Sequence, residues 1–168
     1  MLLRYRSSLL AIIAFAALTV CSAAASAQKH DDSADVAEIL NYHLTMPKVD
    51  RFIAATTALK KMVDSNPELK KQINSGSDDD ASLTQKAAEW DLHFPEATAA
   101  VKSSGFSTRE YMVISIALLN DVLIVGMKKQ GTIKEYPPNA ISSENAAFVE
   151  ANYDKLAQAL APLMPQNQ

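Results

Sequence analysis

The sequence predicts an all-α fold, a single-domain helical bundle of about five or six helices around one central apolar helix at residues 107–130. Apolar residues recur at helical spacing between recognisable helix caps. Alternation of apolar and polar residues, the pattern of a half-buried strand, is nowhere long enough to predict a sheet. The bundle is expected over residues 36–164, followed by a short tail at residues 165–168.

The first 27 residues have the three-part layout of a secretory signal peptide. Arg4 and Arg6 lie near the amino terminus, an apolar run follows at residues 9–20, and small residues lead to Ala27. This run of about 12 residues is shorter than the roughly 20 that a helix needs to cross a bilayer. We therefore expect cleavage after Ala27, export to the periplasm or the medium, and no transmembrane span in the mature chain.

Cys21 supports an alternative, a lipoprotein anchored through an acylated cysteine. Val20 before it is bulkier than the Gly, Ala or Ser usual at such sites, so simple cleavage is preferred. Because Cys21 is the one cysteine of the chain, the cleaved domain would hold none. Disulfides, thiolate metal sites and thiol catalysis are then excluded.

The charge of the mature chain argues against two classes of partner. Removal of Arg4 and Arg6 leaves about 14 basic and 19 acidic side chains in about 141 residues, a formal charge near −5. Basic residues form no cluster longer than a pair, whereas phosphate backbones require a basic surface. Nucleic acid and anionic membrane surfaces are therefore not expected as partners.

The mature chain is expected to begin with a flexible polar lead-in at residues 28–35, which show no periodicity. Residues 36–44 form one or two helical turns or an extended arm. The first clear helix starts after Thr45, because Leu44 and Val49 are spaced as a hydrophobic staple. Its core stripe is expected to comprise Met46, Val49, Phe52, Ile53, Thr56, Leu59 and Val63.

Three shorter helical segments are expected next. Pro67 starts one that runs through Ile73 and ends near Gly76. Ser82 and Gln85 have capping-box spacing and open the second. Pro95 breaks that helix, and a third is expected at residues 96–103.

The central helix begins with the strongest local signal, a capping box at Ser107 and Glu110. Over residues 111–127 only Ser115, Asn120 and Asp121 are polar, and they point in different directions. A helix that is apolar on every side belongs at the centre of a fold. Gly126 inside it is expected to permit close helix packing.

Residues 132–141 cannot be helical because Tyr136, Pro137 and Pro138 lie in their middle, and an extended crossover is expected. Tyr136, Pro137 and Pro138 are candidate interaction residues, since an extended proline segment presents side chains at low entropic cost. Ser142 or Ser143 caps the last helix. Its buried side is expected to hold Phe148, Val149, Tyr153, Leu156, Ala159, Leu160 and Leu163.

Catalytic and metal-binding motifs are not found. His30, His43 and His93 belong to no metal-ligand spacing, and a surface pair is favoured for Glu89 and His93. The acidic residues 78–80 lack the layout of a calcium loop, and no nucleophile elbow or phosphate-binding glycine loop is present. No catalytic residue, metal or cofactor is therefore assigned.

Asn120 and Asp121 are the most informative polar residues, because a buried carboxylate must find a partner or shift its pKa. The preferred interpretation is a polar pair bonded to a neighbouring element; the alternative is a functional site. Trp90, Phe94, Asn120 and Asp121 are the candidate ligand-binding residues, for a small apolar ligand held between the central helix and the stripe at residues 46–63.

Four short segments, at residues 44–49 (LTMPKV), 66–69 (NPEL), 107–111 (STREY) and 145–149 (NAAFV), resemble a family of small exported bacterial all-helical proteins of unknown function. The resemblance spans most of the mature chain. It implies export and a helical fold, and it carries over no catalytic residue.

The leading hypothesis is a non-catalytic binding or interaction module of the cell envelope, with a protein partner or a second copy as a homodimer. A carrier of a small apolar ligand in a helical-bundle cavity is the alternative. A metal-dependent or hydrolytic enzyme is the least favoured hypothesis.

Overall fold

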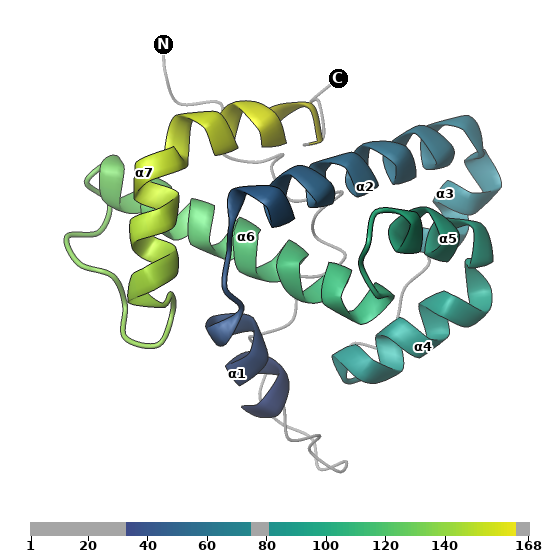
Figure 1. Ribbon diagram of the computed structural model, residues 1–168, viewed down its shortest axis with the longest axis horizontal. Coiled ribbons are helices and arrows are strands. Elements are labelled where there is room, and N and C mark those ends of the chain that lie inside the picture. The colour runs from purple at the N-terminus through teal and green to yellow at the C-terminus, as the bar shows by residue number, and fades with distance from the viewer. Residues whose placement is uncertain (1–32, 75–80, 164–168) are drawn as a thin grey trace.

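The computed structural model describes residues 33–74 and 81–163, in which all regular structure is helical (Figure 1). The elements are α1 (Ser33–Asn41), α2 (Met46–Ser65), α3 (Pro67–Asn74), α4 (Leu83–His93), α5 (Pro95–Ser103), α6 (Thr108–Lys129), α7 (Ser143–Leu160) and the 3₁₀ turn η1 (Ala161–Leu163). The predicted signal peptide with Cys21, His30, Gly76, the acidic residues 78–80 and the predicted tail lie outside the described residues.

The helix α6 is the axis of the bundle, since α1, α2, α4, α5 and α7 all contact it. In Figure 1, α2 runs above α6, α7 crosses it near its carboxyl end, and α4 and α5 lie toward its amino end. The predicted all-α, single-domain bundle around a central apolar helix is confirmed. Seven α-helices are described where about five or six were predicted, because the segment before Thr45 is also helical.

Among the described helices, α6 alone is long and apolar enough to cross a membrane by length and composition. The core helix of a soluble bundle has the same two properties. In this fold 44% of its apolar window is buried by the rest of the protein.

The start of α1 differs from the prediction. Its first residue is Ser33, inside residues 28–35, for which a flexible lead-in was predicted. Asp35 is fixed there by tertiary contacts with Arg109 and with the backbone of Leu83, which local composition does not reveal.

The core begins at Leu44, which is buried together with Val49. Thr45 precedes the helix, as predicted, and has an extended conformation; Pro47 lies in the first turn. The hydroxyl of Thr45 makes no capping hydrogen bond. The fully buried residues of α2 are Val49, Phe52, Ala55 and Leu59.

The two predicted capping boxes have different outcomes. At α4 both hydrogen bonds form, from Gln85 N–H to the Ser82 hydroxyl (3.2 Å) and from Ser82 N–H to the Gln85 side chain (2.9 Å). At α6 the hydroxyl of Ser107 accepts from Glu110 N–H (3.1 Å), but the reciprocal bond is not formed. The carboxylate of Glu110 instead accepts a hydrogen bond from the hydroxyl of Tyr42 (3.0 Å).

Candidate functional site

One side of α6 carries an apolar stripe that the core does not use. We define the α6 stripe as Met112, Ile116, Leu123 and Met127. At 100° per residue these four positions fall within about 60° of one another. Leu123 is 61% exposed and the other three are half-buried. In the part of the chain that the structure describes, none of the four packs against the main core cluster.

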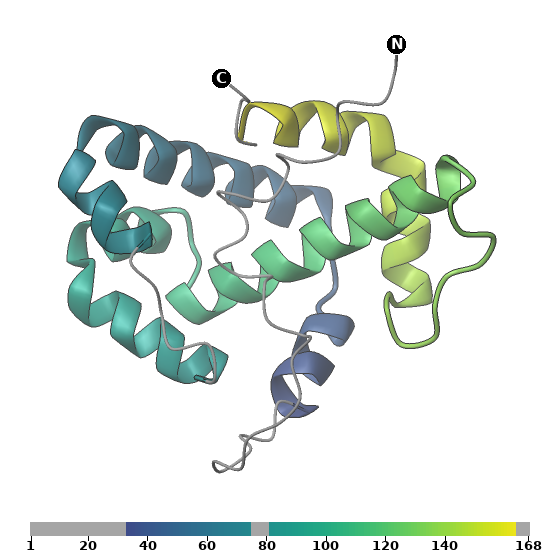
Figure 2. The ribbon, with the colours of Figure 1, turned by 180° about the vertical axis from the view of Figure 1, so that it is seen from behind.

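The helices α2 and α7, which Figure 2 shows from behind, contact α6 away from the α6 stripe. Tyr111 packs on Phe52 of α2 and Asp121 binds Asn145 of α7, and both α6 residues lie about 100° or more around the helix from the stripe. At the amino end, α1 and α4 approach, because Arg109 bonds to Asp35 and Glu38 on α1 and to Thr84 on α4.

The buried carboxylate of Asp121 lies on a different side of α6, where it meets two neutral amides. Its side chain is 3% exposed. Oδ2 accepts a hydrogen bond from Nδ2 of Asn145 (2.9 Å), and Oδ1 accepts a longer one from Nδ2 of Asn120 (3.4 Å). Burial raises the pKa of Asp121 to about 6, although both hydrogen bonds oppose the rise.

Asn145, on the first turn of α7, joins three segments of the chain. Its Nδ2 donates to Asp121 and to the backbone oxygen of Tyr42 (2.9 Å), and its Oδ1 accepts from the backbone N–H of Leu44 (3.1 Å). Asn120 also donates to the backbone oxygen of Ala140 in the connection before α7 (2.7 Å). This arrangement agrees with the structural interpretation of Asn120 and Asp121, because both side chains bind elements packed on α6.

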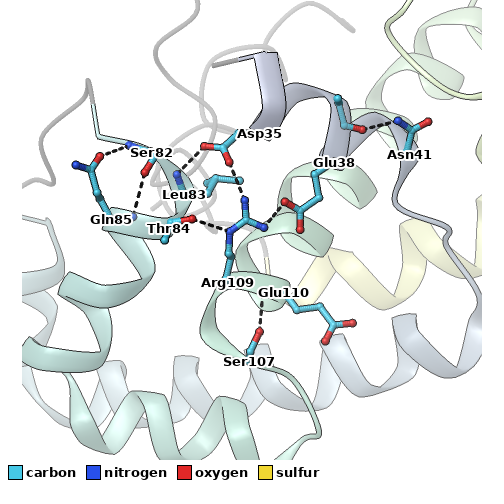
Figure 3. A network of polar contacts seen from close by, with 11 residues as sticks. Asp35, Glu38, Asn41, Ser82, Leu83, Thr84, Gln85, Ser107, Arg109 and Glu110 are labelled. Carbon is cyan, nitrogen blue, oxygen red and sulfur yellow. Dashed lines mark hydrogen bonds and ion pairs between the residues drawn. The ribbon is translucent and has the colours of Figure 1, made fainter. Parts of the chain in front are cut away.

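Arg109 forms a second polar cluster, on the first turn of α6 (Figure 3). Its Nη2 donates to Asp35 (2.8 Å), Nη1 donates to Glu38, and Nε donates to the hydroxyl of Thr84 (3.0 Å). The other oxygen of Asp35 accepts from the backbone N–H of Leu83 (2.8 Å). The cluster therefore joins α1 to the amino ends of α4 and α6, and every guanidinium nitrogen is occupied by the protein itself.

Of the four candidate ligand-binding residues, Phe94 is the one that lines the surface pocket found among the described residues. The rings of Trp90 and Phe94 lie 5.2 Å apart, and both pack against the core cluster. Phe94 lines this pocket of about 250 Å³ together with Asn66, Leu69, His93, Pro95, Glu96 and Ala97. This volume is below the 300 Å³ or so at which ligand pockets usually begin. Asn120 and Asp121 are not among its lining residues.

Residues 132–141 are not helical, as predicted, but a turn over residues 137–140 interrupts the extended crossover, and Tyr136 precedes that turn. The backbone N–H of Ala140 donates to the oxygen of Pro137 (3.2 Å), and Asn139 adopts a positive φ of 59°. Asn tolerates this left-handed conformation better than most residues, which closes the turn.

The ring of Tyr136 is held by α6 and α7. Nζ of Lys128 lies 4.1 Å from the ring centre, and the hydroxyl of Tyr136 donates to Glu150 (2.5 Å). Lys128 and Glu150 also form an ion pair at 3.0 Å. Pro137 and Pro138 are exposed.

Titratable side chains do not converge on a metal site. No group of three or more His, Cys, Asp or Glu residues that could hold a metal ion occurs among residues 33–74 and 81–163. His43 lies 3.3 Å from Glu144 at the surface, and the ring of His93 contacts Phe94.

Asn145, Arg109 and Leu123 do not stand out as site residues in the amino-acid sequence. Asn145 and Arg109 are ordinary first-turn residues, whose partners lie up to 103 residues away in the chain. The α6 stripe was hidden because the whole helix is apolar, so no periodicity distinguishes its open side. No protein-family model, curated protein or solved structure matches this chain.

Proposed function

We propose that this protein is an exported, non-catalytic interaction module that docks a protein partner through the α6 stripe. The observation that carries the proposal is the open apolar stripe beside a buried core, with Leu123 61% exposed. Apolar patches of this kind on a folded domain mark interaction sites.

The chemistry of the stripe favours a helical partner. Apolar anchors spaced along one helix face, in two pairs four residues apart, match the pattern by which amphipathic helices pack together. Met112 and Met127 lie at its two ends, and flexible, polarisable methionine side chains adapt to the shape of a partner surface. We therefore infer that the occupant is an amphipathic helix of another envelope protein.

The cellular location forms part of the same proposal. The signal-peptide layout of residues 1–27 supports export, with the periplasm or the medium as destination and a lipid anchor at Cys21 as the alternative. Mass spectrometry of the mature protein distinguishes them, because cleavage after Ala27 gives an unmodified chain starting at Gln28.

Site-specific photo-crosslinking in the host tests the docking surface. A photoreactive residue at position 123 should give one discrete adduct, and the same residue at position 92 should not. Leu92 is a matched control, because it is a 74% exposed leucine on α4. A photoreactive residue at position 116 should also give the adduct. When Leu123→Asp is added to that protein, the adduct from position 116 should be lost.

The identity of the adduct decides between partners. If the crosslinked protein is a second copy of this chain, the stripe forms a homodimer and the proposal of a different partner protein is wrong. Equal labelling from positions 92 and 123, or no adduct at either, would overturn the docking surface. A small apolar ligand retained by the purified protein in native mass spectrometry would favour the carrier function instead.

A further inference from the structure

We propose that α1 is a strap held closed by Arg109, and that its release enlarges the apolar face available on α6. This inference rests on the proposed function only in that the enlarged face would bind the partner; the contacts of α1 support the strap independently. These contacts include a weak apolar contribution, a charged latch in which Asp35 also accepts from the backbone N–H of Leu83, and a fixed hinge at the carboxyl end.

Apolar packing contributes little to holding α1 in place. None of its nine residues is buried, and Val36 is half exposed. Ile39 and Leu40 are only partly covered. A helix of this length does not persist in water by itself, so α1 depends on tertiary contacts.

The latch lies at the amino end of α1, where Arg109 binds both Asp35 and Glu38. The side chains of Arg109, Asp35 and Glu38 are 31%, 15% and 41% exposed, respectively. Ion pairs that reach solvent to this extent are weakened by dissolved salt. The latch is therefore sensitive to ionic strength, whereas the core is not.

The hinge lies at the carboxyl end, between α1 and α2. Residues 42–45 are not helical, and Leu44 is buried at the start of the core. Asn145 fixes this connection by binding the backbone of both Tyr42 and Leu44. The hydroxyl of Tyr42 adds a bond to Glu110. Release of the latch thus frees α1 up to the hinge and leaves the packing of Leu44 unchanged.

The α6 residues that follow Arg109 lead toward the α6 stripe. Val113 lies one helical turn after Arg109 on the same side of α6, and Ile116 lies one turn further. Val113 is fully buried but does not belong to the main core cluster. We infer that α1 covers Val113, so that its release exposes this side chain beside Ile116 and lengthens the apolar face toward the amino end of α6.

Hydrogen exchange of the full chain tests the strap without knowledge of any partner. In Arg109→Ala, the amides of residues 37–42 should exchange about tenfold faster than in the wild type, and those of α2 and α7 should keep their rates. Glu38→Gln, which removes one of the two ion pairs and leaves α6 intact, should give a smaller acceleration in the same residues. Lys60→Ala, which removes the surface pair with Asp64 on α2, is the matched control and should change nothing in α1.

Salt should reproduce the effect of the variant. About 1 M NaCl should accelerate exchange of residues 37–42 in the wild type and add little in Arg109→Ala. Unchanged exchange of α1 in both latch variants, or acceleration spread equally over all helices, would overturn the strap. The photo-crosslink at position 123 tests the docking function separately. If α1 exchanges faster in the variants but no crosslink forms, the docking function is rejected and the strap is retained.

Discussion

Nδ2 of Asn145 donates a hydrogen bond of 2.9 Å to Oδ2 of Asp121, and this buried pair has no charged partner among the six ion pairs of the described residues. A carboxylate that is solvated only by neutral amides destabilises the fold when it is ionised. The pair therefore makes the stability of this protein depend on pH.

Asp121→Asn should stabilise the protein at neutral pH. The pKa of Asp121 rises from 3.8 to about 6 on folding, so the native state binds more protons between these values. The free energy of unfolding then falls as pH rises through this window. A shift of this size corresponds to about 3 kcal/mol. Urea titrations at pH 4 and pH 7.5 should show the variant more stable only at the higher pH; equal stability at both would reject the shifted carboxyl.

Asn145→Asp should destabilise the protein strongly at neutral pH. It places a second carboxylate beside Asp121 and removes the donor to Tyr42. Each buried group that loses its partner costs about 1–3 kcal/mol. The loss of stability should be smaller at pH 4, where the two carboxyls can share a proton. Thermal melts at pH 4 and pH 7.5 measure the difference. Asn152→Asp, at a half-buried Asn later in α7, is the control with little pH dependence.

The effect of Gly126→Ala on stability should depend on Tyr153. A Cβ at this position would lie 2.5 Å from the hydroxyl oxygen of Tyr153. Overpacking costs about 1–3 kcal/mol and outweighs the helix-propensity gain of alanine of about 1 kcal/mol. In a Tyr153→Phe background the clash is smaller, so the same substitution should be neutral or stabilising. A double-mutant cycle by urea denaturation measures the coupling, and zero coupling would contradict the contact.

Ser82→Ala and Ser107→Ala should differ in severity. Each removes one cap, worth about 1 kcal/mol. Ser82 belongs to a complete capping box, whereas Ser107 makes one side-chain cap bond. We expect a larger loss of thermal stability for Ser82→Ala. The opposite order would show that Asp35, which also binds Leu83 N–H, takes over the cap of α4.

The helical architecture was predictable because it is encoded locally. Ser82, Ser107 and Ser142 cap their helices as their spacing predicts, and Pro67 and Pro95 start new ones. The central position of α6 follows from its composition, and Gly126 allows the predicted close approach of a neighbouring helix.

The remaining features depend on contacts between distant parts of the chain. Glu110 fits a capping box by spacing, yet its carboxylate binds Tyr42, which lies 68 positions earlier. Asp35 looks like part of a polar lead-in until Arg109 is placed beside it. Neither periodicity nor cap spacing identifies which side of an entirely apolar helix stays open, so the α6 stripe required the arrangement of α2 and α7.

Because five helices contact α6, each of them loses packing partners once that axis melts. The molecule should therefore lose its tertiary structure as one cooperative unit. Indole emission from Trp90 on α4 and the tyrosine dichroism signal of Tyr153 on α7, at opposite ends of the axis, should report the same transition midpoint.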